Sequence, residues 1–229
     1  MNAAHQVIVK IEQVSKVYCK GSVAVNALQD VDLEIRKGEF TALVGPSGSG
    51  KTTLLNLIGG LDTPSGGKIW VGDQEIGALS KSRLSDLRLR KVGFVFQEYN
   101  LIPVLSALEN VEYVMLLQGV PEQERRERSL AMLAELGLQG MEHRRPNELS
   151  GGQQQRVAVA RAIVSEPLIV LPDEPTANLD SVAGAALLDL MRELNEAKGI
   201  TFVFSTHDPM VMQRAKRIVH LHDGRVVQQ

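Results

Sequence analysis

A run of glycines and hydroxyl side chains that ends in a lysine and a threonine has the composition of a phosphate-binding loop. It reads Gly45-Pro46-Ser47-Gly48-Ser49-Gly50-Lys51-Thr52, after an apolar stretch and before a helical pattern. Glycines let successive N–H groups face an anion, and the helix that follows adds a favourable dipole. We therefore expect Lys51 to contact the β and γ phosphates of a nucleotide and the Thr52 hydroxyl to ligate Mg²⁺. The alternative is a glycine-rich turn that binds nothing.

Two adjacent carboxylates, Asp173 and Glu174, follow the apolar segment Leu168–Leu171. If that segment is a strand beside the phosphate loop, the two side chains are suited to different tasks. Asp173 is expected to hold hydrated magnesium, and Glu174 to polarise an attacking water as a general base. The pair therefore predicts hydrolysis as well as binding. In the alternative interpretation it only caps the following turn, Pro175-Thr176.

Two more polar residues follow apolar, strand-like segments. His207 comes shortly after Thr201–Ser205, and Gln97 directly after Val92–Phe96. Because the carboxyl ends of parallel strands meet at one edge of a sheet, we expect His207 to reach the γ-phosphate. Gln97 is expected to contact magnesium or the attacking water through its amide. Strand-end position alone separates these two residues from an ordinary histidine and glutamine.

The elements that must position these residues alternate between short apolar strands and helices with apolar residues three and four apart. This alternation predicts an α/β core with a mainly parallel sheet. The expected strands are Val7–Ile11, Val31–Ile35, Phe40–Val44, Val92–Phe96, Leu168–Leu171, Thr201–Ser205 and Ile218–Leu221. The expected helices are Thr52–Gly60, Ala107–Leu117, Glu122–Leu136, Gln153–Val164 and Val182–Ala197. The segments up to about Val31 predict an N-terminal antiparallel β layer, and residues 97–149 an inserted α-helical lobe.

Composition limits the classes of protein. With 25 Lys and Arg against 27 Asp and Glu in 229 residues, the formal charge of -2 gives no electrostatic case for nucleic acid binding. No run approaches the roughly 20 apolar residues of a membrane-spanning helix. The apolar stretch in Met1–Lys10 is too short for a signal peptide, and the single Cys19 excludes an internal disulfide framework. We expect one domain, residues 1–229, that works in the cytosol.

In the order of these motifs the chain resembles the nucleotide-binding subunits of ATP-binding cassette (ABC) transporters over essentially its whole length. Tyr18 is similar to the aromatic residue that stacks on adenine, Gly45–Thr52 to the Walker A loop, Gln97 to the Q-loop glutamine, Leu149–Gln153 to the signature, Leu168–Glu174 to Walker B, Ala177–Asp180 to the D-loop and His207 to the switch histidine. The resemblance implies a P-loop NTPase fold. Residues 1–96 and 150–229 are expected to form a RecA-like core with its β layer, and 97–149 the helical lobe.

The resemblance also implies ATP and Mg²⁺ as cofactors, and a head-to-tail homodimer. In that dimer each ATP lies between the Walker A loop of one subunit and the signature of the other. Ser150 and the N–H groups of Gly151 and Gly152 agree with this, since they begin a predicted helix and form a second anion site. The expected nucleotide contacts are Tyr18, Gly45, Ser47, Gly48, Ser49, Gly50, Lys51, Thr52, Thr53, Ser150, Gly151, Gly152, Gln153 and Asp180. The expected catalytic residues are Glu174, His207 and Gln97, and the expected magnesium ligands are Thr52, Gln97 and Asp173.

Three phrases narrow the resemblance to the lipoprotein-releasing and macrolide-export branch: Gly59–Gly67, Gln97–Pro103 and Ser106–Val111. That branch implies an ATPase peripheral to the cytoplasmic face of the inner membrane, bound to integral membrane permease or transducer subunits and to no nucleic acid. Coupling to those subunits is expected near Gln97–Val111. A regulatory ATPase of the cell-division type, which moves no solute, is the alternative. A soluble ABC ATPase acting on nucleic acid or ribosomes is disfavoured by the lack of a second cassette, a coiled-coil insertion or a basic surplus.

Pro172 departs from the family pattern, which usually has a small residue at this position. Proline removes a backbone donor at the strand end, but the extended geometry of a terminal strand residue suits it. We therefore expect Pro172 to be tolerated without an effect on turnover.

Overall fold

The computed structural model describes residues 6–20 and 23–228, and its central element is a six-stranded sheet with the order β10-β9-β3-β8-β7-β6. Strands β9 to β6 are parallel, and β10 pairs antiparallel with β9 at the edge. The strands are β3 (Phe40–Val44), β6 (Val92–Val95), β7 (Ile169–Pro172), β8 (Phe202–Thr206), β9 (Arg217–His222) and β10 (Arg225–Gln228). The predicted α/β core with a mainly parallel sheet is confirmed. Only the short edge strand β10 was not expected.

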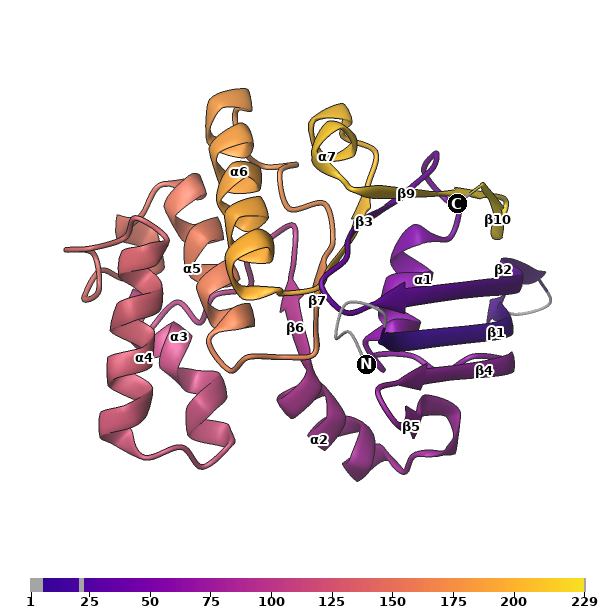
Figure 1. Cartoon of the computed structure of the whole chain (residues 1–229), viewed down its shortest axis with the longest axis horizontal. Helices are drawn as coiled ribbons and strands as arrows, with labels where there is room; N and C mark the ends of the chain where they lie inside the picture. The colour runs from indigo at the N-terminus through magenta and orange to yellow at the C-terminus, as the bar shows by residue number, and fades with distance from the viewer. Residues whose placement is uncertain (1–5, 21–22, 229) are drawn as a thin grey trace.

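An antiparallel sheet with the order β2-β1-β4-β5 forms the other end of the molecule from helices α3 and α4 (Figure 1). Its strands are β1 (Val7–Lys20), β2 (Val23–Arg36), β4 (Gly66–Val71) and β5 (Gln74–Glu75). The predicted β layer is therefore present, but it is larger than expected. Register shifts along β1 and β2 break the alternation of apolar and polar residues, and two glycines open β4, so the sequence pattern reveals only part of these strands.

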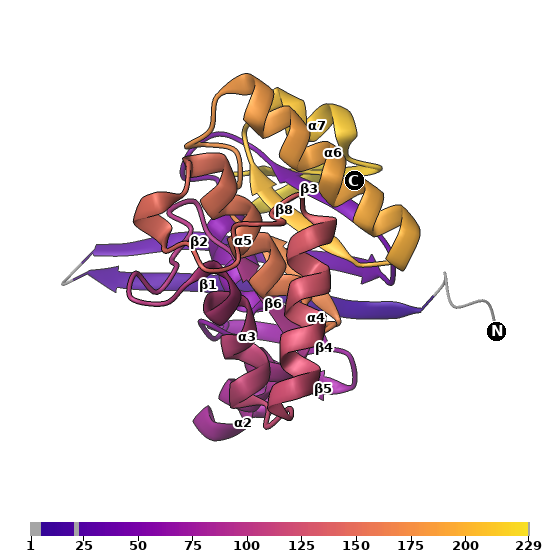
Figure 2. The same cartoon turned by 90° about the vertical axis from the view of Figure 1, so that its left-hand side faces the viewer.

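The helices are α1 (Lys51–Ile58), α2 (Lys81–Lys91), α3 (Ala107–Leu117), α4 (Glu122–Glu135), α5 (Gly151–Ile163), α6 (Ser181–Lys198) and α7 (Pro209–Arg214), with short 3₁₀ turns at Ile76–Ala78 and Pro146–Glu148. Helices α2 and α7 were not predicted. Helix α2 is mostly charged and buries few side chains, among them Leu84 and Leu87, while α7 is a six-residue turn. Helices α3 and α4 pack on each other and on α5 (Figure 2). Residues 97–149 are thus helical as expected, and their role as a separate lobe stays a prediction.

The core has two apolar clusters, one on each face of the six-stranded sheet. Ala42 and Val44 of β3 belong to the cluster that contains α3, α5 and α6, whereas Leu43 belongs to the cluster that contains α1 and the antiparallel layer. Val170 and Leu171 of β7 divide in the same way. This is the two-residue periodicity of a strand, and parallel sheets are covered by other elements on both faces. Helices α1 and α5, which follow the two glycine motifs, are therefore on opposite faces of the sheet.

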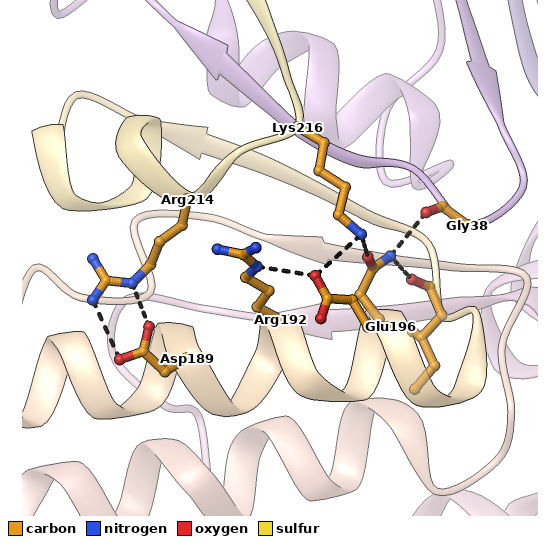
Figure 3. A network of polar contacts seen from close by, with 8 residues as sticks. Gly38, Asp189, Arg192, Glu196, Arg214 and Lys216 are labelled. Carbon is orange, nitrogen blue, oxygen red and sulfur yellow. Dashed lines mark hydrogen bonds and ion pairs between the residues drawn. The ribbon is translucent and has the colours of Figure 1, made fainter.

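A polar network fixes the position of α6 against the core (Figure 3). The buried side chain of Asn195 donates to the carbonyls of Gly38 (2.9 Å) and Ile200 (2.7 Å), and it accepts from Lys216 Nζ at 2.8 Å. Further along α6, Asp189 pairs with Arg214 of α7 at 2.7 Å. Helix α6 follows Ala177–Asp180, and α7 follows His207. The bond between Asp189 and Arg214 therefore fixes the position of these two segments relative to each other.

Within residues 6–20 and 23–228, none of the helices combines the length and the apolar composition needed to traverse a bilayer. Cys19 is exposed with a free thiol. Half of the segment Met1–Lys10, residues 1–5, lies outside the described residues.

Candidate functional site

The phosphate loop connects the buried strand β3 to helix α1, and its backbone requires glycine. Gly48 and Gly50 have φ angles of 79° and 101°, in the left-handed region that favours glycine. A Cβ on Gly50 would lie 2.5 Å from the carbonyl oxygen of Ala27, so no side chain fits there. Gly50 is also the N-cap of α1 and provides no side-chain cap. The N–H groups of the first turn are therefore available to an anion.

Lys51 is held inside this loop. Its ammonium group donates to the carbonyl oxygens of Gly45 (2.7 Å) and Pro46 (3.0 Å), and the residue is buried. Ser49 is buried as well, whereas Ser47 and Gly48 are exposed on the loop. The positive charge is therefore at the centre of the loop, where a phosphate on the loop N–H groups would meet it.

Thr52 and Asp173 come together from elements 121 residues apart. The Thr52 hydroxyl donates to Asp173 Oδ1 at 3.1 Å. A hydroxyl and a carboxylate oxygen are ligands that Mg²⁺ accepts, and the ion commonly takes its remaining ligands from water and phosphate. The described residues contain no group of three or more His, Cys, Asp or Glu suited to a metal. The donor set fits magnesium bound together with a nucleotide.

Glu174 and His207 meet at the same edge of the sheet. Glu174 Oε1 lies 2.6 Å from His207 Nδ1, and Glu174 Oε2 accepts from the Thr206 hydroxyl at 3.3 Å. The glutamate side chain is 17% exposed and the histidine side chain 73%. Glu174 also has a φ of 48°, a strained backbone that turns the chain sharply after β7. The Thr206 hydroxyl and the exposed His207 imidazole, both at the end of β8, thus orient the shielded Glu174 carboxylate.

The backbone around Pro172 shows why its missing N–H matters little to this arrangement. Val170 N donates to the Thr201 carbonyl (2.8 Å) and Glu174 N to the Ser205 carbonyl (2.9 Å). The alternation of a parallel ladder places position 172 opposite the Val203 carbonyl, where proline cannot donate. Pro172 therefore removes one hydrogen bond between β7 and β8, but the bond at Glu174 itself is intact.

Gln97 follows β6 at this edge, but its side chain is exposed. Within the described part of the chain no hydrogen bond joins its amide to Asp173 or Glu174. Its backbone carbonyl accepts from Asn178 Nδ2 at 2.9 Å, which ties the Q-loop to the D-loop. Sequence reasoning did not single out Asn178. Asp180, expected at the nucleotide, caps α6 by accepting from Ala183 N at 2.8 Å.

The signature begins helix α5 with a reciprocal cap. Ser150 Oγ accepts from Gln153 N, and Gln153 Oε1 accepts from Ser150 N at 2.9 Å. A Cβ on Gly151 would lie 2.8 Å from the Tyr99 hydroxyl, so the Tyr99 side chain would have to shift to admit a larger residue. Gly151 and Gly152 form the first turn, where N–H groups have no partner within the helix. Among the described hydrogen bonds and ion pairs, none joins Leu149–Gln153 to Gly45–Thr52.

Tyr18 lies near the end of β1, directly opposite Val25 of β2. Its hydroxyl donates to Asp62 Oδ2 at 2.8 Å and is also within hydrogen-bonding reach of Thr53 in the first turn of α1. The expected aromatic residue is therefore beside the phosphate loop. Sequence reasoning missed Asp62, and only its position in the segment Gly59–Gly67 could have pointed to it.

Comparisons with known proteins agree with this arrangement. The family model described as ABC transporter matches residues 28–177. The chain is 48% identical over 220 residues to the lipoprotein-releasing system ATP-binding protein LolD of Anaeromyxobacter dehalogenans, covering 96% of this chain and 92% of that protein. It is 46% identical to the macrolide export ATP-binding/permease protein MacB of Sodalis glossinidius, of whose length it spans only 34% against 96% of its own. A solved dimer of the ATP-binding cassette MJ0796 of Methanocaldococcus jannaschii, bound to ADP and Pi, superposes with a TM-score of 0.88 at 44% identity, covering 96% of this chain and 97% of that one.

Proposed function

The chain belongs to the ABC transporter family and is an ATP-binding cassette ATPase, and we propose that it is the ATP-hydrolysing subunit of an inner-membrane complex of the lipoprotein-releasing or macrolide-export type. ATP closes a head-to-tail dimer of the chain, and hydrolysis opens it again. The observation that supports this best is the common edge of the sheet. There the Thr52–Asp173 pair lies beside the Glu174–His207 pair.

Each group at this edge has a distinct task in the proposed reaction. Lys51 binds the β and γ phosphates, helped by the N–H groups of the loop and of the first turn of α1. Glu174 takes a proton from the attacking water, and His207 and Thr206 hold its carboxylate in position. Thr52 and Asp173 would hold Mg²⁺, which would supply positive charge at the phosphates. The His207 imidazole is exposed at the sheet edge and is therefore accessible to the γ-phosphate.

The second half of the nucleotide site comes from another copy of the chain. Ser150, Gly151 and Gly152 present a helix N-terminus, and α5 packs on the opposite face of the sheet from α1. One subunit is therefore poorly suited to place both glycine motifs on one nucleotide. The related cassette MJ0796 has been solved as a dimer with ADP and Pi, and we expect the same association here.

Helix α5 connects the signature to the catalytic loops. Gln155 is buried, and its Nε2 donates to the carbonyl of Pro175 at 2.9 Å, next to Glu174. Arg161, whose guanidinium pKa is lowered by burial, donates to the Tyr99 carbonyl at 2.8 Å. A displacement of α5 by a nucleotide on the partner would therefore move both the general base and the Gln97–Val111 segment. This path supports the transmission of force to a membrane subunit.

A groove of about 330 Å³ lies where that segment meets the core, lined by Leu61, Phe94, Phe96, Asn100, Val114 and Arg161. Nearby along the chain, Val104 is 70% exposed, and Tyr113, Leu116 and Leu117 form an exposed apolar row on α3. A mainly apolar groove, with exposed apolar side chains close to it along the chain, suits the apolar face of a short amphipathic helix. We assign this surface to the cytoplasmic part of a membrane subunit.

Cysteine crosslinking from this surface tests the assignment. In a Cys19→Ser background, Val104→Cys should crosslink to the membrane protein encoded next to this gene, and the crosslink should change when ATP is added. Asp86→Cys, an exposed position on α2, is the matched control. Crosslinks from Asp86→Cys alone would contradict the assignment. A partner that carries lipoproteins or a small export substrate supports the transport complex, whereas a partner without transported cargo supports the cell-division type.

A further inference from the structure

Three side chains form a bonded cluster beside the first turn of α1: Lys16 and Tyr18 of β1, and Asp62 of the loop after α1. Asp62 accepts from Lys16 Nζ at 2.6 Å, from the Tyr18 hydroxyl at 2.8 Å and from the Thr63 N–H at 2.7 Å. Each carboxylate oxygen thus has a donor. Burial opposes ionisation of Asp62, but the bonds from Lys16, Tyr18 and Thr63 outweigh it and lower the carboxyl pKa.

Lys16 is the buried member of this cluster. Its ammonium group also donates to the Thr63 carbonyl at 2.8 Å and lies 4.9 Å from the centroid of the Tyr18 ring. That distance is within the range of a cation–π interaction. One face of the ring therefore meets a fixed positive charge. Tyr18 is nevertheless 41% exposed, which leaves part of its ring surface free for a flat ligand.

The segment that carries Asp62 is itself anchored to α1. Leu61 N and Asp62 N both donate to the carbonyl of Asn56, at 2.9 and 3.4 Å. The other end of α1 carries Lys51 and Thr52. A single short helix therefore connects the phosphate-binding groups to the carboxylate that holds the tyrosine.

We propose that Asp62 is a positioning residue for the nucleotide base: by holding the Tyr18 hydroxyl, with Lys16 behind the ring, it fixes the ring in the orientation that stacks on adenine. This rests on the proposed function as an ATPase and on the family resemblance, which implies that Tyr18 stacks on the base. Because the hydroxyl gives its proton to Asp62, it is not available to donate a hydrogen bond to the base. The ring then contributes stacking, and the phosphates supply the rest of the affinity.

A double-mutant cycle on Tyr18→Phe and Asp62→Ala tests the proposal, with thermal unfolding confirming that each variant is folded. Each change should raise the KM for ATP by roughly three- to tenfold, the effect of one side-chain hydrogen bond. The double variant should be no worse than the single ones. Inhibition by tripolyphosphate, which has no base, should be unchanged, and kcat should fall by less than twofold. Asp86→Ala removes an exposed carboxylate in a helical ion pair and is the control.

Asp62→Ala also removes the carboxylate that pairs with Lys16, so Tyr18→Phe, which keeps the Lys16–Asp62 pair, is the independent test of the Tyr18–Asp62 bond. Three results would each overturn the role of Asp62. The first is additive effects of the two substitutions on KM, and the second is an equal loss of tripolyphosphate inhibition. The third is a KM that stays unchanged in Tyr18→Phe although Tyr18→Ala raises it. Failure of the proposed function has a different signature. In that case Tyr18→Ala and Lys51→Ala would both leave ATP binding as it is in the parent protein.

Discussion

The carboxylate of Glu174 and the imidazole of His207 are 2.6 Å apart, although 33 positions separate them in the chain. Strands β7 and β8 are neighbours in the sheet, and each residue follows the end of its strand. The contact is therefore a result of parallel strand order, which brings strand ends with no local relationship to one edge. The proposed general base and the proposed group that orients it therefore follow two different strands, β7 and β8.

Replacement of Glu174 by glutamine should keep ATP binding and stop turnover. The amide has nearly the same shape but cannot take the water's proton, so kcat should fall by about 10²- to 10⁴-fold. The protein should then accumulate as an ATP-dependent dimer, visible by gel filtration with ATP and Mg²⁺. A Glu174→Gln protein that stays monomeric at high concentration would contradict the head-to-tail arrangement.

Substitution of Lys51 should weaken ATP binding, whereas substitution of Asp173 should weaken Mg²⁺ binding. Lys51→Ala removes the charge from the centre of the loop, so ATP affinity should fall by roughly 10- to 100-fold, the effect of a charge-assisted hydrogen bond. Asp173→Asn should instead raise the Mg²⁺ concentration needed for half-maximal turnover, by about tenfold. Titrating each variant with ATP at saturating Mg²⁺, and then with Mg²⁺ at saturating ATP, separates the two. A chelator should abolish turnover in the parent protein.

Pro172→Ala should change turnover by less than tenfold, about 1.4 kcal/mol of barrier. Alanine restores a donor opposite the Val203 carbonyl, which stabilises by about 1 kcal/mol. It also gives the unfolded chain more freedom, which costs about 0.4–1 kcal/mol. The free energy of unfolding, measured in urea, should therefore move little. A more than tenfold faster ATPase would identify Pro172 as a brake on the catalytic strand.

Glu112 of α3 should make the protein less stable at neutral pH. Burial raises the pKa of its carboxyl above the usual value near 4.5, against the weaker effect of Arg125, and Oε1 has no hydrogen-bond partner among the described atoms. Its folded-state pKa is raised, so its favourable contribution is complete below the unfolded pKa and is lost as pH rises through the folded pKa. Glu112→Gln should raise Tm by about 2 °C at pH 7.5, and the gain should vanish near pH 4.

Glu109 on the same helix is the matched control with the opposite sign. It accepts from Ser106 N at 2.7 Å in the capping box of α3, and those bonds lower its pKa. Glu109→Gln should therefore lower Tm at pH 7.5. Equal shifts for both substitutions would mean that burial of Glu112 is not the cause.

Sequence patterns predicted the strands that are buried on both faces, because β3, β7 and β8 are short, mainly apolar segments in which every residue is buried. They missed α2, whose stability depends on a few buried leucines and on the Ser80 cap, and β4, which opens with glycines. In the site, strand-end position was enough to place His207 at the same sheet edge as Glu174, but it did not predict their contact. The contact of Tyr18 with Asp62 spans 44 residues and depends on how the chain turns back along α1, which no local pattern encodes.

The reciprocal cap of Ser150 and Gln153 has a kinetic consequence. Because these side chains already satisfy N–H groups at the start of α5, this end of the helix needs no phosphate to keep its shape. Two subunits can therefore meet as preformed surfaces, without waiting for a segment to fold. The encounter rate should then depend on subunit concentration, and the lifetime of each encounter on the state of the nucleotide. The duration of each cycle should then be set by the lifetime of the dimer.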